Sequence, residues 1–328
     1  MGTMQALTAR EYGGVEVLEL REVPIPRPGP GQIQVRIAAA ALNPADLRLA
    51  SGVFGQAAPL TFPHVLGNDF AGTVTAVGAG GGPYAVGDEV FGMGLPMAAR
   101  GLAGPLSSPP PLATGTMAEY AVFDAGAPAH ALRPAGLSAE RAASLPTAAL
   151  TALPLLRAAS LAEGTKALVI GAAGGVGSAV VPLLAARGVH VVATALPEDE
   201  EYVRGLGAAE VIDYRAADTA AETRRRHPGG VDALVNLVLP GTSLPAMAGL
   251  VRPGGRVLNI AFPSPGPGSG IETVYMTARP GELEEVAALT VKGVLPDGVT
   301  RRYPRDQAVH AYTDLEHGHV TGKLVITW

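Results

Sequence analysis

The chain has 328 residues, of which 48% are hydrophobic, so it is long enough for two domains and apolar enough to bury a large core. Its net charge of -5 and its lack of a basic cluster argue against a nucleic-acid partner. It contains no cysteine, which excludes disulfides, thiolate metal sites and a cysteine nucleophile. The sequence has no apolar run of the roughly 18 residues that a membrane span needs, and its start lacks the layout of a signal peptide. We therefore expect a cytoplasmic protein with no membrane partner.

The first third of the chain has the pattern of β-strands. The segment QIQVRIAA alternates polar and apolar residues and places Ile33, Val35 and Ile37 on one face, as in a half-buried strand. DFAGTVTAVG and GDEVFG are two further strand segments bounded by glycine. The final segment, GKLVITW, is again a strand pattern, and we expect it to rejoin this β-rich part.

From about residue 137 the pattern changes to alternating helices and strands. SAERAASLPTAALTALPLLRAA has the spacing of a helix. The apolar runs that follow are KALVIGA, VHVVATA, AEVIDY, VDALVNLV and GRVLNIAF. Such unbroken runs of Val, Ile and Leu suit parallel strands that are buried on both faces, which predicts a doubly wound α/β domain.

Two segments have the composition of loops. Residues 93–115 are rich in Gly, Pro and Ser, and residues 263–270 read PSPGPGSG. Loops longer than about 12 to 15 residues commonly act as lids over a site or are disordered. The longer segment is therefore equally compatible with a substrate lid and with a surface loop.

A glycine cluster follows the first apolar run of the predicted α/β domain. The stretch AAGGVG contains Ala172-x-Gly174-x-x-Gly177, a dinucleotide fingerprint in which alanine replaces the first glycine. Gly174 lets the backbone approach a pyrophosphate, and Gly177 lets the next helix pack closely on the strand. The start of that helix offers free N–H groups to phosphates. Because the cluster follows a strand and opens a helix, we interpret it as a dinucleotide site rather than a purely structural turn.

A set of motifs runs along nearly the whole chain: PGPGQIQVRI, ALNPADLRLASG, LGNDFAGTVTAVG, VGDEVFG, TMAEYAVF, LPTAALTAL, GAAGGVGSAV, LGAAEVIDY and GHVTGKLVI. Together they resemble the medium-chain dehydrogenase/reductase superfamily, in its zinc-independent, quinone oxidoreductase-like branch. The resemblance implies a GroES-like β-rich catalytic domain formed by residues 1–125 and 266–328. It also implies a Rossmann domain with a doubly wound parallel sheet over residues 126–265, and an active site in the cleft between the two domains.

The resemblance also bears on zinc. In zinc-dependent relatives a cysteine stands at the position of Asn43, and a His-Glu pair stands where this chain has Asn68 and Asp69. Catalytic zinc takes about three protein ligands, of which only the Asp69 carboxylate remains. His317 and His319 are close in sequence, but two histidines in such a turn are more typical of solvent exposure. We therefore predict no bound metal.

The absence of a Lewis acid restricts the chemistry that we expect. Hydride delivery from a reduced nicotinamide then requires an acceptor that is already electron-poor, such as a quinone or an α,β-unsaturated carbonyl. Enoyl reductases of the superfamily carry a proton-donating tyrosine at the position of Phe54, in SGVF. Phenylalanine has no proton to donate, which speaks against tyrosine-assisted enoyl reduction. Quinones tolerate the loss because the hydroquinone oxygens take protons from solvent.

The resemblance assigns roles to residues near the predicted nicotinamide. Asn43 is the candidate catalytic residue and lies beside the nicotinamide, as does Thr151. Asp46 and Phe54 are assigned to the substrate pocket. Asn43 and Asp46 are also favoured capping residues for the helix PADLRLASG, and both interpretations stay open.

The acidic segment LPEDEE bears on the choice between NADPH and NADH. NADPH-using relatives surround the 2′-phosphate with a hydroxyl residue, often a lysine, and a tyrosine. Thr194 and Tyr214 match the first and the last of these, and the lysine position falls near Glu200. A carboxylate at Glu200 suits a free ribose 2′-hydroxyl, but the acidic run also suits a helix N-terminus that faces solvent. We prefer the second interpretation and predict NADPH, with NADH as the alternative. The full set of predicted cofactor contacts is Asn43, Thr151, Gly174, Gly175, Val176, Gly177, Thr194, Tyr214, Asn236, Ile260 and Phe262.

The sequence thus predicts an NADPH-dependent oxidoreductase that acts on a small quinone or α,β-unsaturated carbonyl. Two alternatives stay open: a tailoring enoyl or ketone reductase that acts on one biosynthetic intermediate, and a nucleotide-binding protein with little turnover. The family resemblance implies a homodimer, in which IETVYMTARP adds an edge strand across a two-fold axis.

Overall fold

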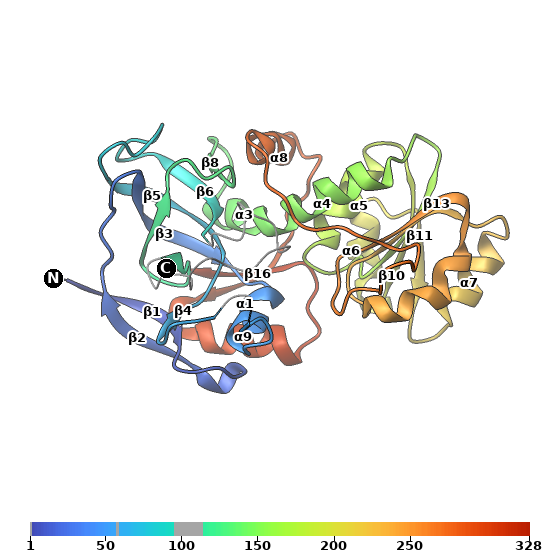
Figure 1. The fold of residues 1–328 in the computed structure, drawn as a ribbon. Helices are drawn as coiled ribbons and strands as arrows, with labels where there is room; N and C mark the ends of the chain where they lie inside the picture. The colour runs from blue at the N-terminus through green and yellow to red at the C-terminus, as the bar shows by residue number, and fades with distance from the viewer. Residues whose placement is uncertain (1, 57–58, 95–113) are drawn as a thin grey trace. The chain divides into compact units, whose positions relative to one another are not determined.

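The computed structural model describes residues 2–56, 59–94 and 114–328, which form two compact units (Figure 1). Unit 1 comprises Met1–Leu150, Thr277–Val291 and Asp297–Trp328, and unit 2 comprises Thr151–Met276 and Lys292–Pro296. The predicted domain limits lie at 125/126 and 265/266. The first limit differs because helix α3 (Ala139–Ser144) packs on the strands of unit 1, and the second because residues 272–273 pair with residues 258–259 of unit 2. Within the described ranges, no helix combines the length and the apolar character that a membrane crossing requires.

Unit 1 is built on two sheets (Figure 1). The larger has the strand order β15-β16-β3-β5-β6-β8, with β7 also pairing with β3, and the smaller has the order β2-β1-β4. The strands of the larger sheet are β3 (Gln32–Ala41), β5 (Asp69–Val77), β6 (Glu89–Met93), β7 (Tyr120–Asp124), β8 (His130–Leu132), β15 (Val299–Pro304) and β16 (Lys323–Thr327). Those of the smaller sheet are β1 (Thr3–Ala9), β2 (Leu18–Pro24) and β4 (His64–Val65).

Strand β3 lies at the centre of unit 1, as its alternating sequence predicts. Ile33, Val35 and Ile37 are buried in the core, while the polar residues between them are not. The C-terminal strand β16 pairs antiparallel with β3, with Ile326 opposite Ala40. The prediction that the end of the chain rejoins the β-rich part is therefore confirmed.

The helices of unit 1 are short. Besides α3 they are α1 (Pro44–Ala50), α8 (Glu282–Val291) and α9 (Ala308–His317), with 3-10 turns η1 (Val15–Val17) and η5 (Arg305–Gln307). Helix α4 (Pro146–Ala159) carries the chain from unit 1 into unit 2. The single helix expected over this region is therefore two helices, because Pro146 has no N–H to donate and suits the first turn of a new helix.

Unit 2 contains one parallel sheet with the strand order β11-β10-β9-β12-β13-β14. Its strands are β9 (Lys166–Ile170), β10 (His190–Ala195), β11 (Glu210–Asp213), β12 (Val231–Asn236), β13 (Val251–Asn259) and β14 (Glu272–Thr273). The helices are α5 (Gly177–Ala185), α6 (Glu200–Gly205) and α7 (Thr219–Arg226), with 3-10 segments η3 (Pro197–Asp199) and η4 (Gly241–Leu250). Counted along the chain, the strands run 3-2-1-4-5-6, the order of a Rossmann fold. The doubly wound α/β prediction is confirmed.

Candidate functional site

A buried polar cluster lies where β3, α1, β5, α9 and β16 of unit 1 meet. Its members are at most 5% exposed, and they are Asn43, Asp46, Asp69, Tyr312 and Lys323. Asp69 and Lys323 are the first residues of β5 and β16, and Asn43 precedes α1. Charged groups this deep are tolerated only when they are paired and hydrogen-bonded. The cluster therefore has to satisfy its charges internally.

The ammonium group of Lys323 lies at the centre of this cluster. Its Nζ donates to the carbonyl of Leu42 at 2.9 Å and to Oδ1 of Asn43 at 2.6 Å, and it lies 3.6 Å from Oδ2 of Asp69. The amide nitrogen of Asn43 donates to the same carboxylate oxygen at 3.0 Å. Asn43 thus bridges a buried cation and a buried anion, which fixes the orientation of its amide.

The two carboxyl groups of the cluster have different surroundings. Oδ1 of Asp69 accepts a hydrogen bond from the hydroxyl of Thr147 at 2.7 Å. Burial raises the pKa of Asp69, and the charge of Lys323 opposes this. Oδ2 of Asp46 accepts from the backbone N–H of Asn43 and from the hydroxyl of Tyr312, each at 2.9 Å. Burial raises the pKa of Asp46 to about 7, and the Asn43 N–H opposes this.

These contacts bear on both interpretations of Asn43 and Asp46. Asn43 is the N-cap residue of α1, and the Asp46 side chain accepts its N–H in the manner of a capping box. The same Asn43 side chain is hydrogen-bonded to Lys323 and Asp69. The structure therefore gives Asn43 a capping position and a place in a charged network at once.

The donor set of this cluster does not fit a catalytic zinc ion. The positions that carry ligands in zinc-dependent relatives hold Asn43, Asn68 and Asp69, two amides and one carboxylate. The amide nitrogen of Asn68 donates to Thr147 at 3.4 Å, and the other two side chains contact the Lys323 ammonium. Zinc sites in proteins are built from thiolates, imidazoles and carboxylates, and of the residues at these three positions only Asp69 offers such a group.

The glycine turn of unit 2 connects the carboxyl end of β9 to α5. A Cβ atom on Gly177 would lie 2.1 Å from the carbonyl oxygen of Ala172, so only glycine lets the helix approach the turn this closely. At Gly174 the nearest atom would be the Gly171 oxygen at 3.6 Å, which leaves that backbone open to a ligand. The turn lies where the strand order reverses between β9 and β12, the usual position of a dinucleotide pyrophosphate. The residues present fit such a group.

The other predicted cofactor residues of unit 2 follow the ends of neighbouring strands. Thr194, in β10, is buried and accepts the N–H of Gly171 at 3.2 Å, so it holds the glycine turn in place. Tyr214 follows β11 and is 47% exposed. Asn236 ends β12 and is buried, with its Nδ2 donating to Asn259 at 2.7 Å. The half-buried residues Ile260 and Phe262 follow β13. Because the strands are parallel, these residues share one edge of the sheet with Gly174, Gly175, Val176 and Gly177.

The remaining predicted residues are Thr151 and Phe54. Thr151 lies in α4 and is buried. Phe54 is half-buried in the turn that follows α1. The ring of Tyr12 packs against Gly52 of this turn, at 2.9 Å from where a Cβ would lie, and the Tyr12 hydroxyl accepts the N–H of Leu60 at 2.8 Å. Of the loop predicted over 93–115, residues 95–113 lie outside the described residues.

The acidic segment that bears on the choice of cofactor forms η3 and the start of α6. The carboxylate of Glu200 accepts a hydrogen bond from Nε of Arg204, one turn further along, at 2.8 Å. Glu198 and Glu201 are exposed, as expected for helix-terminal charges, whereas Asp199 is buried. The interpretation as a helix start fits the structure, except that one of the acidic side chains faces inward.

Three residues that the sequence analysis passed over belong to the surroundings of the site: Lys323, Tyr312 and Tyr12. Lys323 could have been noticed because it is a charged residue at the start of an otherwise apolar strand segment, GKLVITW. Nothing local marks Tyr312, because its partner Asp46 is 266 residues away.

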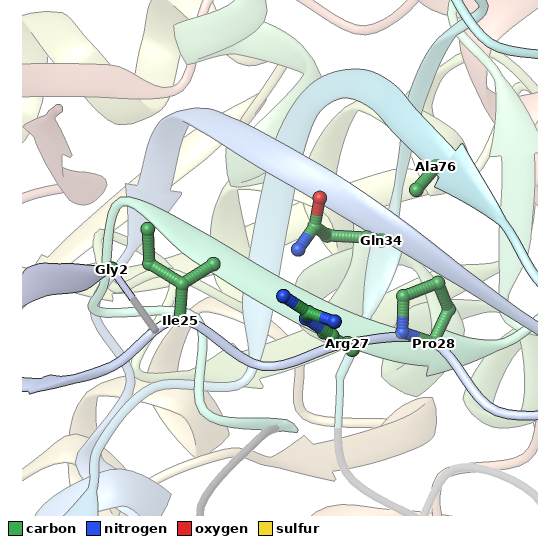
Figure 2. Close-up of a pocket in the computed structure, with 6 residues that line it drawn as sticks. All are labelled: Gly2, Ile25, Arg27, Pro28, Gln34 and Ala76. Atoms are coloured by element: carbon green, nitrogen blue, oxygen red, sulfur yellow. The ribbon is translucent and has the colours of Figure 1, made fainter.

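A separate hollow of about 450 Å³ lies on unit 1 (Figure 2). Its lining residues are Gly2, Ile25, Arg27, Pro28, Gln34 and Ala76. The amide of Gln34 is already hydrogen-bonded to Pro26 and Thr75. None of the predicted site residues lines this hollow, so it contributes nothing to the candidate site.

Comparison with known proteins identifies the family. Residues 29–133 match the alcohol dehydrogenase GroES-like domain, and residues 206–326 match a family described as zinc-binding dehydrogenase. A chloroplast envelope quinone oxidoreductase homolog of Arabidopsis thaliana is 30% identical and aligns over 98% of both chains. The chain belongs to the medium-chain dehydrogenase/reductase superfamily. An NADPH-dependent alkenal/one oxidoreductase of the same plant is 31% identical over 98% of this chain and 79% of its own.

The quinone oxidoreductase homologues, together with the family models, support the quinone oxidoreductase-like branch of this superfamily. The quinone oxidoreductase of Coxiella burnetii superposes with a TM-score of 0.86 at 27% identity, over 100% of both chains. The GroES-like and Rossmann architecture expected from the sequence is confirmed. As a medium-chain dehydrogenase/reductase, the chain is an enzyme, an oxidoreductase of the NAD(P)H-dependent class.

Replacing Lys323 with methionine tests the buried network. Lys323→Met leaves the Asp69 carboxylate buried without its cation, so we expect a loss of about 3–5 kcal/mol in the free energy of unfolding. The matched control is Lys292→Met at an exposed lysine, which should change stability by less than about 0.5 kcal/mol. Urea unfolding of the wild type and both variants measures these free energies. A Lys323→Met variant as stable as the control would show that the network is not stabilised by this charge.

The raised pKa of Asp46 predicts a pH effect on stability. Between about pH 4, where an unfolded Asp titrates, and about pH 7, the folded protein binds more protons at this group than the unfolded chain does. The contribution of Asp46 to stability therefore falls as pH rises through this window. Relative to Asp46→Asn, the wild type should lose about 2 kcal/mol of unfolding free energy between about pH 5 and pH 7. The control is Asp306→Asn, a change at an exposed aspartate. If the difference in unfolding free energy between the wild type and Asp46→Asn varied with pH no more than the difference between the wild type and Asp306→Asn, the prediction would be contradicted.

Proposed function

We propose that this enzyme transfers a hydride from NADPH to a quinone or an α,β-unsaturated carbonyl without a catalytic metal. The observation that carries the proposal is the Lys323 ammonium, which is hydrogen-bonded to Asn43 and lies 3.6 Å from Asp69, at the positions where zinc-dependent relatives hold their ligands. Without a Lewis acid to polarise an alcohol or ketone, the acceptor has to be electron-poor already. The names of the relatives, a quinone oxidoreductase homolog and an alkenal/one oxidoreductase, support this class of acceptor.

Most of the residues that would hold the cofactor lie at the carboxyl ends of the parallel strands of unit 2. The backbone N–H groups of residues 174–177 and the start of α5 would bind the pyrophosphate. Thr194 would position the turn, and Tyr214, exposed at the end of β11, would lie beside the adenosine ribose. Asn43 and Thr151 are the proposed neighbours of the nicotinamide. NADPH supplies the hydride when bound, and these residues orient it.

The hydrogen bonds of Asn43 would hold its side chain in one orientation near the acceptor. Its side chain is held by Lys323 on one side and Asp69 on the other, so it cannot rotate freely. A preorganised group of this kind loses little entropy when substrate binds. The substrate pocket proposed here includes Asp46 and Phe54. Because Asp46 already accepts two hydrogen bonds, its part there would be to hold Asn43 and Tyr312 in position.

We also propose that the enzyme is a cytoplasmic homodimer. The segment predicted to form an edge strand contains β14, which is the last strand of the unit 2 sheet within the described residues. An edge strand offers unpaired N–H and C=O groups that a second copy can cover.

The contacts of Glu200 support the proposed preference for NADPH. Its carboxylate is bound to Arg204 within α6, so we expect it to leave a 2′-phosphate undisturbed and NADPH to bind more tightly than NADH. Glu200→Gln should therefore keep the ratio of the two dissociation constants within about twofold. Fluorescence titration of both cofactors with wild type and variant measures this. NADH binding tenfold tighter than NADPH in the wild type would overturn the assignment.

The acceptor class is tested by restoring the missing acid. Phe54→Tyr should leave NADPH-dependent quinone reduction nearly unchanged, because the hydroquinone oxygens take protons from solvent. The rate of enone reduction should rise by roughly 10²-fold or more where protonation limits the rate. Phe62→Tyr adds the same hydroxyl to a ring that packs on Tyr12, and serves as the matched control.

Three outcomes of that assay would count against the proposal. Equal and substantial enone reduction by wild type and Phe54→Tyr would show that another acid already supplies the proton. A similar rise in the Phe62→Tyr control would remove Phe54 from the argument. An absence of NADPH oxidation with every quinone and enone would favour a nucleotide-binding protein with little turnover or a reductase for one biosynthetic intermediate.

A further inference from the structure

A second group of polar side chains lies in unit 2, at the opposite edge of the sheet from the glycine turn. His190 is the first residue of β10, Glu210 is the first residue of β11, and His227 follows the last residue of α7. The strands are parallel, so their first residues share the amino edge, while the glycine turn follows a carboxyl end. Strands of about six residues place these edges roughly 20 Å apart. The group is therefore separate from the proposed cofactor site.

The three side chains converge on a single point. Nε2 of His190 lies 2.7 Å from Oε1 of Glu210, and Nε2 of His227 lies 3.2 Å from the same oxygen. One nitrogen or oxygen atom of each residue lies within 4.8 Å of the others. Ligand bonds of about 2.0–2.2 Å in a tetrahedron put ligand atoms about 3.4 Å apart. Small side-chain rotations would bring the three atoms to that separation.

His227 is buried and its ring nitrogens are without hydrogen-bond partners among the described residues. Its side chain is only 6% exposed. The close approach of its Nε2 to Glu210 is not directed as a hydrogen bond. A buried polar atom without a partner is costly. An ion bound between His227, His190 and Glu210 would give this nitrogen a partner.

The two oxygens of Glu210 have different neighbours, and Oε1, which is hydrogen-bonded to Nε2 of His190 at 2.7 Å, is the oxygen that faces both histidines. The other oxygen, Oε2, lies 3.5 Å from Nη1 of Arg226. The Arg226 guanidinium also donates to Glu222 at 2.7 Å and to the Val211 carbonyl at 3.0 Å, so its charge is largely balanced elsewhere. A partner that holds the second oxygen in this way orients a metal-binding carboxylate.

We propose that His190, Glu210 and His227 form a binding site for Zn²⁺ or a similar late first-row divalent metal ion. Two imidazoles and one carboxylate are a recognised zinc donor set that leaves a fourth position for water. The ion would tie together the starts of β10 and β11 and the end of α7. Because the site lies at the far edge of the sheet from the glycine turn, the ion would take no part in the proposed hydride transfer.

This site is independent of the proposed function, and it revises the expectation that the chain binds no metal. That expectation rested on the absence of cysteine and of a zinc ligand set at Asn43 and Asp69. The new ligands come from separate segments without a metal-binding spacing, so only the fold brings them together. His317 and His319, which are close in sequence, are both exposed and do not belong to this group.

The test is a titration of the full-length protein with Zn²⁺ alone, after removal of any affinity tag and dialysis against chelator. Calorimetry should show saturable one-to-one binding, and the unfolding temperature should rise with zinc concentration. His190→Ala should weaken binding at least about tenfold. Because His190 is partly exposed, this variant should fold as the wild type does, which circular dichroism verifies. The double variant His317→Ala/His319→Ala is the matched control and should bind zinc like the wild type.

Two results would contradict the proposal of a zinc site. One is the absence of saturable one-to-one zinc binding in the wild type. The other is equal zinc affinity in the wild type and in a folded His190→Ala or Glu210→Gln variant. The readouts are binding and unfolding temperature, so a failure of this site leaves the proposed hydride transfer untouched. Conversely, an enzyme inactive with quinones would still show zinc binding if the site exists.

Discussion

The buried ammonium of Lys323 is the constraint on which the arrangement of unit 1 depends. It joins the first residue of β16 to the end of β3 and, through Asn43, to Asp69 at the start of β5. A charge that is buried this fully is stable only beside its partners, so the three segments have to meet in one geometry. The pairing of the C-terminal strand with β3 and the position of α1 follow from the same contacts.

The same constraint shapes the chemistry that we propose. A cation supplied by the chain itself, the Lys323 ammonium, is hydrogen-bonded to Asn43 and lies beside Asp69, and it offers hydrogen-bond donors rather than an open coordination site. The protein's contribution to catalysis is then orientation and electrostatics, with the hydride coming from the cofactor. Unit 2 complements this with a glycine turn that only glycine at position 177 can form, next to an open backbone at Gly174.

Much of this fold could be predicted from local patterns, because burial leaves a local signature in the sequence. The alternation in β3 and the apolar runs of β9 to β13 were sufficient to locate the strands, and the glycine cluster marked the turn between β9 and α5. The polar cluster could not be found in this way, since Lys323 and Asn43 are 280 residues apart. The same holds for the metal site proposed at His190, Glu210 and His227. These residues have no metal-binding spacing in the sequence, and only the folded sheet brings them together.

The central claim, hydride transfer without a catalytic metal, is tested most directly by assaying the chelator-treated enzyme. The measurement is NADPH-dependent quinone turnover together with the zinc content of the same sample. It is made in the His190→Ala variant, so that zinc at the site proposed for His190, Glu210 and His227 does not interfere. We predict full turnover at a zinc content far below one equivalent. Loss of turnover on chelation, with recovery on adding one equivalent of zinc, would contradict it.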